Sequence, residues 1–175
     1  MLLRTLGLAG DGVEIGVRAG HFSAEILQVS WLRRLFAVDP WHAIDDHVYV
    51  DITNTTPEGH ERNYRETAAR LARFGDRAQL LRMTSAEAAP CFPDRSLDFV
   101  YIDGNHSFAA CAEDIALWWP KVRSGGILAG HDYLDCRLPE GGFGVKSAVD
   151  AFGAPEALPI FVAAEKWPTW YVHRP

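Results

Sequence analysis

Two kinds of segment alternate along this chain. Short apolar runs, often β-branched, are separated by longer segments in which apolar residues recur every three or four positions. The short runs are typical of buried strands, and the longer segments are typical of helices with one buried face. Strands are predicted at residues 13–16, 35–40, 78–83, 97–102, 127–130, 160–164 and 169–173. Helices are predicted at residues 22–34, 58–74, 84–87, 107–119 and 145–152, after about one turn of helix within residues 1–11.

The order of these elements predicts the fold class. Strands that alternate with helices favour a parallel sheet covered on both faces, and the last two strands are close enough in sequence to pair antiparallel. We therefore expect residues 1–175 to form a single doubly wound α/β domain, with a mostly parallel seven-stranded sheet and a C-terminal antiparallel strand. Helical spacing predicts two buried faces, one with Phe22, Ile26 and Val29 and one with Phe108, Cys111, Ile115 and Trp118.

Composition and charge exclude several classes of protein. With 48% hydrophobic and 23% charged residues, the chain is typical of soluble globular domains. The net charge is −6 and the basic residues are scattered, so a nucleic acid is not an expected partner. No apolar run approaches the roughly 20 residues that span a bilayer, and no leader pattern precedes Val13, so we expect a cytoplasmic protein. The three cysteines include no Cys-x-x-Cys pair for zinc or redox chemistry.

The first strand leads into a glycine-containing turn. Gly16 ends the strand, Gly20 follows four residues later, and the next helix begins at Phe22. Glycines allow a sharp turn and a close approach of the backbone to a ligand, which the N–H groups of the helix start also face. The spacing differs from the Gly-x-Gly-x-x-Gly of dinucleotide enzymes. Asp39 ends the second strand, where a carboxylate can accept hydrogen bonds from ribose hydroxyls; an Asp-Pro turn is the alternative.

Further polar residues follow the fourth and fifth strands. Asp103 and His106 come after one, and His131 and Asp132 come after the other. If these strands are neighbours, both groups reach one divalent ion at the carboxyl edge of the sheet, where ligands bind in such folds. A neutral imidazole at His106 suits a general base. Taken singly, each group also fits an ordinary turn, helix start or strand end.

These motifs together resemble the class I S-adenosylmethionine-dependent methyltransferases. The similarity extends from Glu14 to His173, and Pro120 to Gly130 is similar to that family's approach to its fifth strand. The resemblance implies a Rossmann-like domain that binds S-adenosyl-L-methionine. The cofactor-binding residues that it implies are Glu14, Gly16, Gly20, Asp39, Ser85 and Asp103. From the residues alone, Ser85 is either a ligand of the bound base or part of a helix cap.

Within that family, Tyr101 to His106 and Gly130 to Tyr133 most resemble bacterial small-molecule O-methyltransferases that act on sugar or macrolide hydroxyls with a divalent metal. This resemblance implies an O-methyltransferase with Asp103 and His106 as catalytic residues. It also implies Mg²⁺ or Mn²⁺ held by Asp103, His131 and Asp132. Because His131 stands where those enzymes carry an acidic residue, metal use stays open.

The acceptor site is less defined. Metal-dependent catechol enzymes carry extra N-terminal helices over the substrate, so part of the acceptor site here must come from Trp41 to Pro57, from Leu134 to Phe143, or from a second subunit of a homo-oligomer. The expected partner is a small molecule with a hydroxyl group, with neither a nucleic acid nor a membrane. The competing functions are a nicotinamide-dependent oxidoreductase and a non-catalytic cofactor-binding module.

Overall fold

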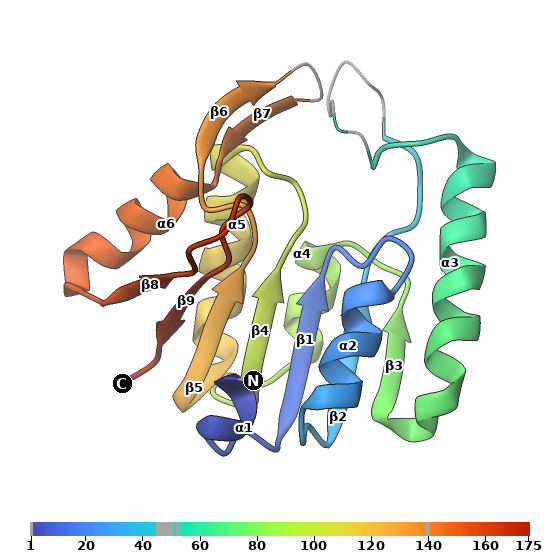
Figure 1. The fold of residues 1–175 in the computed structure, drawn as a ribbon, viewed down its shortest axis with the longest axis horizontal. Helices are drawn as coiled ribbons and strands as arrows, with labels where there is room; N and C mark the ends of the chain where they lie inside the picture. Colours follow the sequence, from blue (N-terminus) through green and yellow to red (C-terminus); the bar gives the residue numbers. More distant parts are fainter. Residues whose placement is uncertain (1, 45–50, 52, 139–140) are drawn as a thin grey trace.

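A seven-stranded sheet forms the centre of the protein (Figure 1). The structure is a computed structural model and describes residues 2–44, 51, 53–138 and 141–175. The strands of the sheet are β1 (Asp11–Ile15), β2 (Arg34–Val38), β3 (Ala78–Leu81), β4 (Leu97–Ile102), β5 (Val122–Gly130), β8 (Ile160–Val162) and β9 (Trp170–His173). Their order is β3-β2-β1-β4-β5-β9-β8, and only the pairs that involve β9 are antiparallel among the described residues. This confirms the predicted α/β fold and its antiparallel C-terminal strand.

Helices cover both faces of the sheet (Figure 1). One face packs against α1 (Leu2–Thr5), α2 (His21–Val29) and α3 (Pro57–Leu71), and the other against α4 (Ser85–Ala88), α5 (Phe108–Trp118) and α6 (Val145–Gly153). Short 3₁₀ helices lie at η1 (Ala72–Arg77), η2 (Ala89–Cys91), η3 (Trp119–Lys121) and η4 (Ala154–Glu156). Strand β4 contributes side chains to both core layers. Val100 and Ile102 pack with α4, α5 and α6, and Phe99 and Tyr101 pack with α1, α2 and α3. Because the central strands run parallel, their carboxyl ends all lie at the same edge of the sheet.

Several predicted boundaries differ from the structure. Helix α2 ends at Val29 instead of residue 34, because Arg34 already pairs with Asp11 in the sheet. Val29 is therefore 38% exposed and does not belong to the predicted buried face. Phe108 is also 49% exposed, because as the first residue of α5 it lies at the helix end. Strand β5 begins at Val122, five residues earlier than predicted.

A small hairpin was not predicted from the sequence. Strands β6 (Asp135–Leu138) and β7 (Gly141–Gly144) pair antiparallel outside the main sheet, near the carboxyl ends of its strands (Figure 1). The Gly141–Gly144 segment has three glycines and one apolar side chain, so it shows no alternating pattern. Among the described residues, no helix is both long and apolar enough to cross a membrane.

Candidate functional site

A large cavity opens at the carboxyl edge of the sheet. Its volume is about 960 Å³, within the range of small-molecule sites. Eight of the nine residues predicted from the sequence line it: Glu14, Gly16, Asp39, Ser85, Asp103, His106, His131 and Asp132. Gly20 is outside the lining. The structure thus brings together residues from the ends of β1, β2, β4 and β5 and from the start of α4.

The two glycines of the first turn are required by the protein's own packing. Gly16 has a φ of 82°, and a Cβ there would lie 2.0 Å from the carbonyl oxygen of Asp103. Gly20 has a φ of 72°, and a Cβ there would lie 2.8 Å from Thr67 Cγ2. The sharp turn is as expected, but the close approach that needs glycine is to β4 and α3. Packing alone therefore accounts for both glycines, and their contact with a ligand stays a prediction.

The Asp39 carboxylate organises this same turn. Its Oδ2 accepts hydrogen bonds from the backbone N–H groups of Val17 and Arg18, both at 2.9 Å, and its Oδ1 accepts one from Trp41 N at 2.7 Å. Arg18 and Trp41 have φ values of 54° and 43°, so the carboxylate stabilises two left-handed residues. Asp39 lies at the cavity wall. Its contact with a ribose stays a prediction.

Glu14 and Ser85 are held by neighbouring side chains. The Glu14 carboxyl is 1% exposed and accepts a hydrogen bond from the Ser23 hydroxyl, and burial raises its pKa to about 8. The Ser85 hydroxyl donates to Asp114 and accepts from Trp118 Nε1 at 2.8 Å. The N-cap of α4 is instead Thr84, which forms a capping box with Glu87. Both cofactor assignments remain predictions, with their polar atoms already partnered inside the protein.

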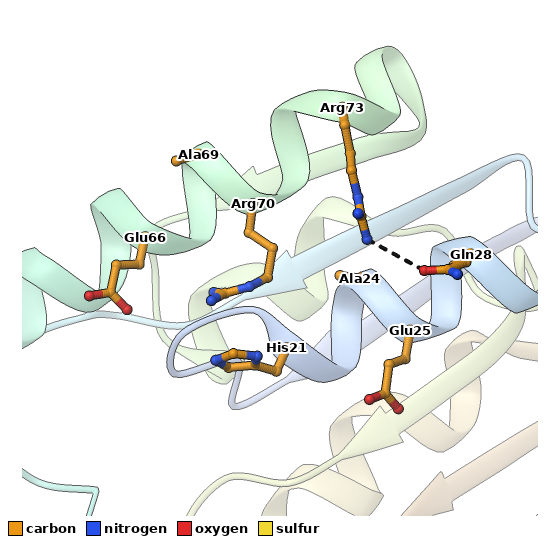
Figure 2. A pocket seen from close by; sticks show the side chains of 8 residues that line it. All are labelled: His21, Ala24, Glu25, Gln28, Glu66, Ala69, Arg70 and Arg73. Carbon is orange, nitrogen blue, oxygen red and sulfur yellow. Dashed lines mark hydrogen bonds between the residues drawn. The ribbon is translucent and has the colours of Figure 1, made fainter.

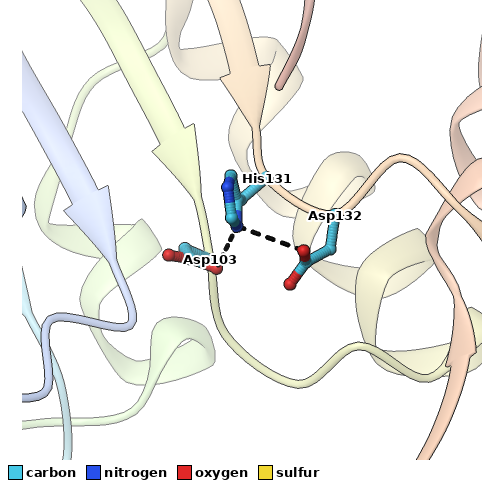
Figure 3. A group of neighbouring side chains, drawn as sticks. All are labelled: Asp103, His131 and Asp132. Atoms are coloured by element: carbon cyan, nitrogen blue, oxygen red, sulfur yellow. Dashed lines mark ion pairs between the residues drawn. The ribbon is translucent and has the colours of Figure 1, made fainter. Parts of the chain in front are cut away.

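Asp103, His131 and Asp132 form a compact group at the ends of β4 and β5 (Figure 3). One ligand atom from each lies within 4.8 Å of the others. His131 Nδ1 is 3.2 Å from Asp132 Oδ1 and 3.9 Å from Asp103 Oδ1. Asp132 has a φ of 53°, an uncommon conformation that turns its carboxylate into this group. Two carboxylates and an imidazole are a donor set for a divalent cation, so these residues fit the predicted metal.

His106 lies beside this group, surrounded by three carboxylates. Its Nε2 is 3.1 Å from Asp132 Oδ2 and 3.5 Å from Asp103 Oδ1, and its Nδ1 is 3.1 Å from Asp51 Oδ2. Burial opposes the charged form, but the three carboxylates outweigh it and raise the pKa of His106 to about 11. The ring is therefore protonated at neutral pH unless a cation shares these carboxylates. The predicted role as a base thus depends on that second positive charge.

Asp51 was not identified from the sequence. It lies in the polar segment after β2, 55 positions before His106, and its neighbours gave no pattern that distinguishes it from other acidic residues of that segment. Its side chain is 8% exposed. Burial raises the pKa of this carboxyl, but the bonds from His106 and Thr53 outweigh burial and lower it to about 2. What distinguishes Asp51 from the other acidic residues of this segment is the burial of its carboxylate, which only the structure shows.

Aromatic side chains close one side of the cavity. Phe143 of β7 stacks on the His106 ring, with centroids 4.8 Å apart, and Trp167 lies next to Phe143 at 6.1 Å. Both segments expected at the acceptor site contribute to the lining: His42, Ile44, Asp51, Thr53 and Asn54 from the first, and Phe143 from the second. Residues 45–50, 52, 139 and 140 of these segments lie outside the described residues.

A second, open groove lies between α2 and α3 (Figure 2). Its volume is about 670 Å³, and its walls mix acidic and basic side chains, with Arg73 Nη2 3.5 Å from Gln28 Oε1. Arg70 contacts the Ala19 carbonyl oxygen at the base of the first turn. Since none of the predicted site residues lines this groove, the chemistry is concentrated in the larger cavity.

Comparison with known proteins assigns the family. Residues 13–133 match the family described as a methyltransferase domain. The chain belongs to this family. Together with the sheet order, the match confirms the resemblance to class I S-adenosylmethionine-dependent methyltransferases. The family does not by itself fix the atom that is methylated, the acceptor or the use of a metal.

Two uncharacterized proteins are similar in sequence to this methyltransferase domain. One, from Sinorhizobium fredii, is 29% identical over 139 residues, which are 76% of this chain and 14% of that protein. The other, from Acanthamoeba polyphaga mimivirus, is 25% identical over 130 residues, which are 71% of this chain and 52% of that protein. This chain therefore corresponds to a part of each of these longer relatives.

Solved methyltransferases share the fold. An O-methyltransferase from Bacillus cereus in complex with SAH superimposes with a TM-score of 0.66 at 12% identity, over 99% of this chain and 77% of that one. An rRNA methylase from Streptococcus thermophilus has a TM-score of 0.62 at 14% identity, over 95% of this chain and 87% of that one. At these identities the likeness concerns the fold only.

Proposed function

We propose that this chain transfers a methyl group from S-adenosyl-L-methionine to a hydroxyl of a small ring-shaped molecule, such as a sugar or another natural product. The observation that carries the proposal is the convergence of Asp103, His131 and Asp132 beside His106 inside the cavity. This arrangement combines a cation site with a group that can take a proton, and both activate a hydroxyl acceptor.

The charge of the cavity supports a positively charged methyl donor. Seven carboxyl groups line the described part of the cavity: Glu14, Asp39, Asp51, Asp103, Glu113, Asp114 and Asp132. Burial raises the pKa of Glu14 to about 8, so the negative charge at neutral pH comes from the other six. Among these described lining residues, Arg18 is the only arginine and lysine is absent. Such a lining attracts a sulfonium and a divalent cation, and it repels the pyrophosphate of a nicotinamide cofactor or an RNA backbone. The charge therefore favours the methyl donor over both alternatives.

Asp103, His131 and Asp132 would hold the cation. A bound divalent metal lowers the pKa of a coordinated hydroxyl as a Lewis acid. Because one of the three donors is an imidazole, we expect Mn²⁺ to bind at least as well as Mg²⁺, which prefers oxygen donors. The protein's contribution is the fixed position of these donors at two neighbouring strand ends.

The chain's other residues align the acceptor and exclude water. Phe143 and Trp167 offer apolar surface against which a ring can pack, next to His106. His106 takes the hydroxyl proton at Nε2 while the hydroxyl oxygen forms the new bond to the methyl carbon, and the electrons of the carbon–sulfur bond return to sulfur. Because a sulfonium is already electrophilic, the protein mainly has to align the acceptor and remove its proton.

Calorimetric titration with S-adenosyl-L-methionine and with NAD tests the donor. We expect binding of the first only, and tight binding of NAD alone would overturn the proposal. A screen of hydroxylated sugars, phenols and an rRNA fragment with labelled donor then tests the acceptor, in EDTA and after addition of Mg²⁺ or Mn²⁺. Transfer to rRNA alone would refute a small-molecule acceptor, and donor binding without any transfer would favour a non-catalytic module.

A further inference from the structure

Asp51 connects the segment after β2 to His106. Its Oδ2 lies 3.1 Å from His106 Nδ1, and its Oδ1 accepts hydrogen bonds from both the backbone N–H and the hydroxyl of Thr53, each at 2.7 Å. The side chain is 8% exposed. The two oxygens of the carboxylate therefore have different partners, since Thr53 holds one and the other faces the imidazole.

The imidazole of His106 is constrained on its other sides as well. Phe143 stacks on its face, and 15% of the side chain is exposed. Its Nε2 faces Asp132 at 3.1 Å and is buried without a properly aligned hydrogen-bond partner among the described residues. The ring therefore has one satisfied nitrogen, Nδ1, and one nitrogen directed at the cation-binding group.

We propose that Asp51 is a positioning residue that sets the tautomer of His106. Since a carboxylate can only accept, it requires a proton on Nδ1, and the neutral ring then carries its lone pair on Nε2. That lone pair points to Asp103 and Asp132, where the acceptor hydroxyl is activated under the proposed function, on which this inference rests. After proton transfer, Asp51 stabilises the resulting imidazolium. A carboxylate behind a functional histidine is the usual means of orienting its ring.

Asp51→Asn is the sharpest test because it is nearly isosteric. The carbonyl oxygen of the amide can still accept both bonds from Thr53, while the amide N–H now faces Nδ1. The ring is thereby driven to the tautomer with its proton on Nε2. We expect kcat to fall by roughly 10²–10⁴, the contribution of a positioned base, with the KM for S-adenosyl-L-methionine within a few-fold. Asp94→Asn, at a surface pair with Lys121, is the matched control and should leave kcat unchanged.

A double-mutant cycle separates positioning from general damage. If Asp51 acts through His106, Asp51→Asn should have no further effect on kcat in the His106→Ala background. Equal losses in both backgrounds would overturn the inference, as would a wild-type kcat in Asp51→Asn alone. A near-unfolded circular dichroism spectrum of Asp51→Asn would direct the cycle to Asp51→Ser, which keeps a small polar side chain but cannot reach Nδ1, with the same expectations.

Proton NMR provides a readout that does not need activity. A hydrogen-bonded imidazole N–H gives a downfield, slowly exchanging resonance, which we expect in the wild type. The resonance assigned to Nδ1–H through its directly bonded ¹⁵N should be missing in both Asp51→Asn and His106→Ala and present in Asp94→Asn, whereas an Nε2–H facing Asp132 gives a separate signal. If no acceptor is methylated but this pattern is found, the proposed function fails while the Asp51–His106 contact stands. An Nδ1–H resonance that persists unshifted in Asp51→Asn would refute the contact itself.

Discussion

Gly16→Ala tests whether the first turn is constrained by β4. The residue has a φ of 82°, which costs an alanine about 1–2 kcal/mol. The new methyl group would also lie 2.0 Å from the Asp103 carbonyl oxygen and 2.5 Å from its carbon. Because these are backbone atoms, they can yield only if the end of β4 moves, and such overpacking costs about 1–3 kcal/mol. We expect a total loss of about 2–5 kcal/mol in the free energy of unfolding.

Gly7→Ala provides the matched control. Gly7 has a φ of 66°, but nothing lies within 4 Å of the position of its Cβ. This variant should therefore lose only the backbone contribution, about 1–2 kcal/mol. Urea unfolding followed by the fluorescence of the six tryptophans measures both variants.

The difference between the two variants is the decisive quantity. A separation of about 1–3 kcal/mol corresponds to a Tm difference of roughly 2–12 °C for a chain of this size. Divalent-cation affinity should fall only in Gly16→Ala, because its methyl group displaces Asp103. If the two variants unfold within about 0.5 kcal/mol of each other, the packing argument for Gly16 is refuted.

Three further outcomes are expected. Asp103→Asn and Asp132→Asn should each abolish Mn²⁺ binding and turnover, while the affinity for S-adenosyl-L-methionine stays within a few-fold of the wild type. Calorimetry that shows normal Mn²⁺ binding in these variants would exclude this site. Asp39→Ala should lower the free energy of unfolding by about 1–3 kcal/mol in urea, because three backbone N–H groups lose their acceptor; an unchanged unfolding midpoint would contradict this. The pKa of Glu14 is about 8 in the folded state and 4.5 in the unfolded chain, so between these pH values only the folded state keeps the carboxyl protonated. The free energy of unfolding should therefore fall as the pH rises from about 4.5 to about 8. Glu14→Gln should therefore match the wild type near pH 5 and exceed it at pH 8 in urea unfolding; equal stability at both pH values would refute the assignment.

The sequence determined the sheet and most of the residues that gather at its carboxyl edge. Strand β4 was predicted with its observed bounds, since a fully buried strand in a parallel sheet reads as one continuous apolar run. Asp103 directly follows one such run and Asp132 comes two residues after another, so the rule that parallel strands end at one edge was enough to bring them together. Local sequence patterns predict where a residue lies when its position is fixed by the end of a strand or helix.

Contacts between distant segments were decided by the tertiary structure. Asp51 contacts His106 across 55 positions, from a segment without hydrophobic periodicity. Phe143 stacks on the same ring from β7, a strand whose three glycines leave no alternating pattern that would predict it. Gly16 likewise looked like a ligand-binding glycine, and only the position of Asp103 shows what its missing side chain avoids. The protonation of His106 follows the same rule, because three carboxylates from three segments set its charge. Distances between such segments depend on how the layers pack, and no local pattern in the sequence encodes them.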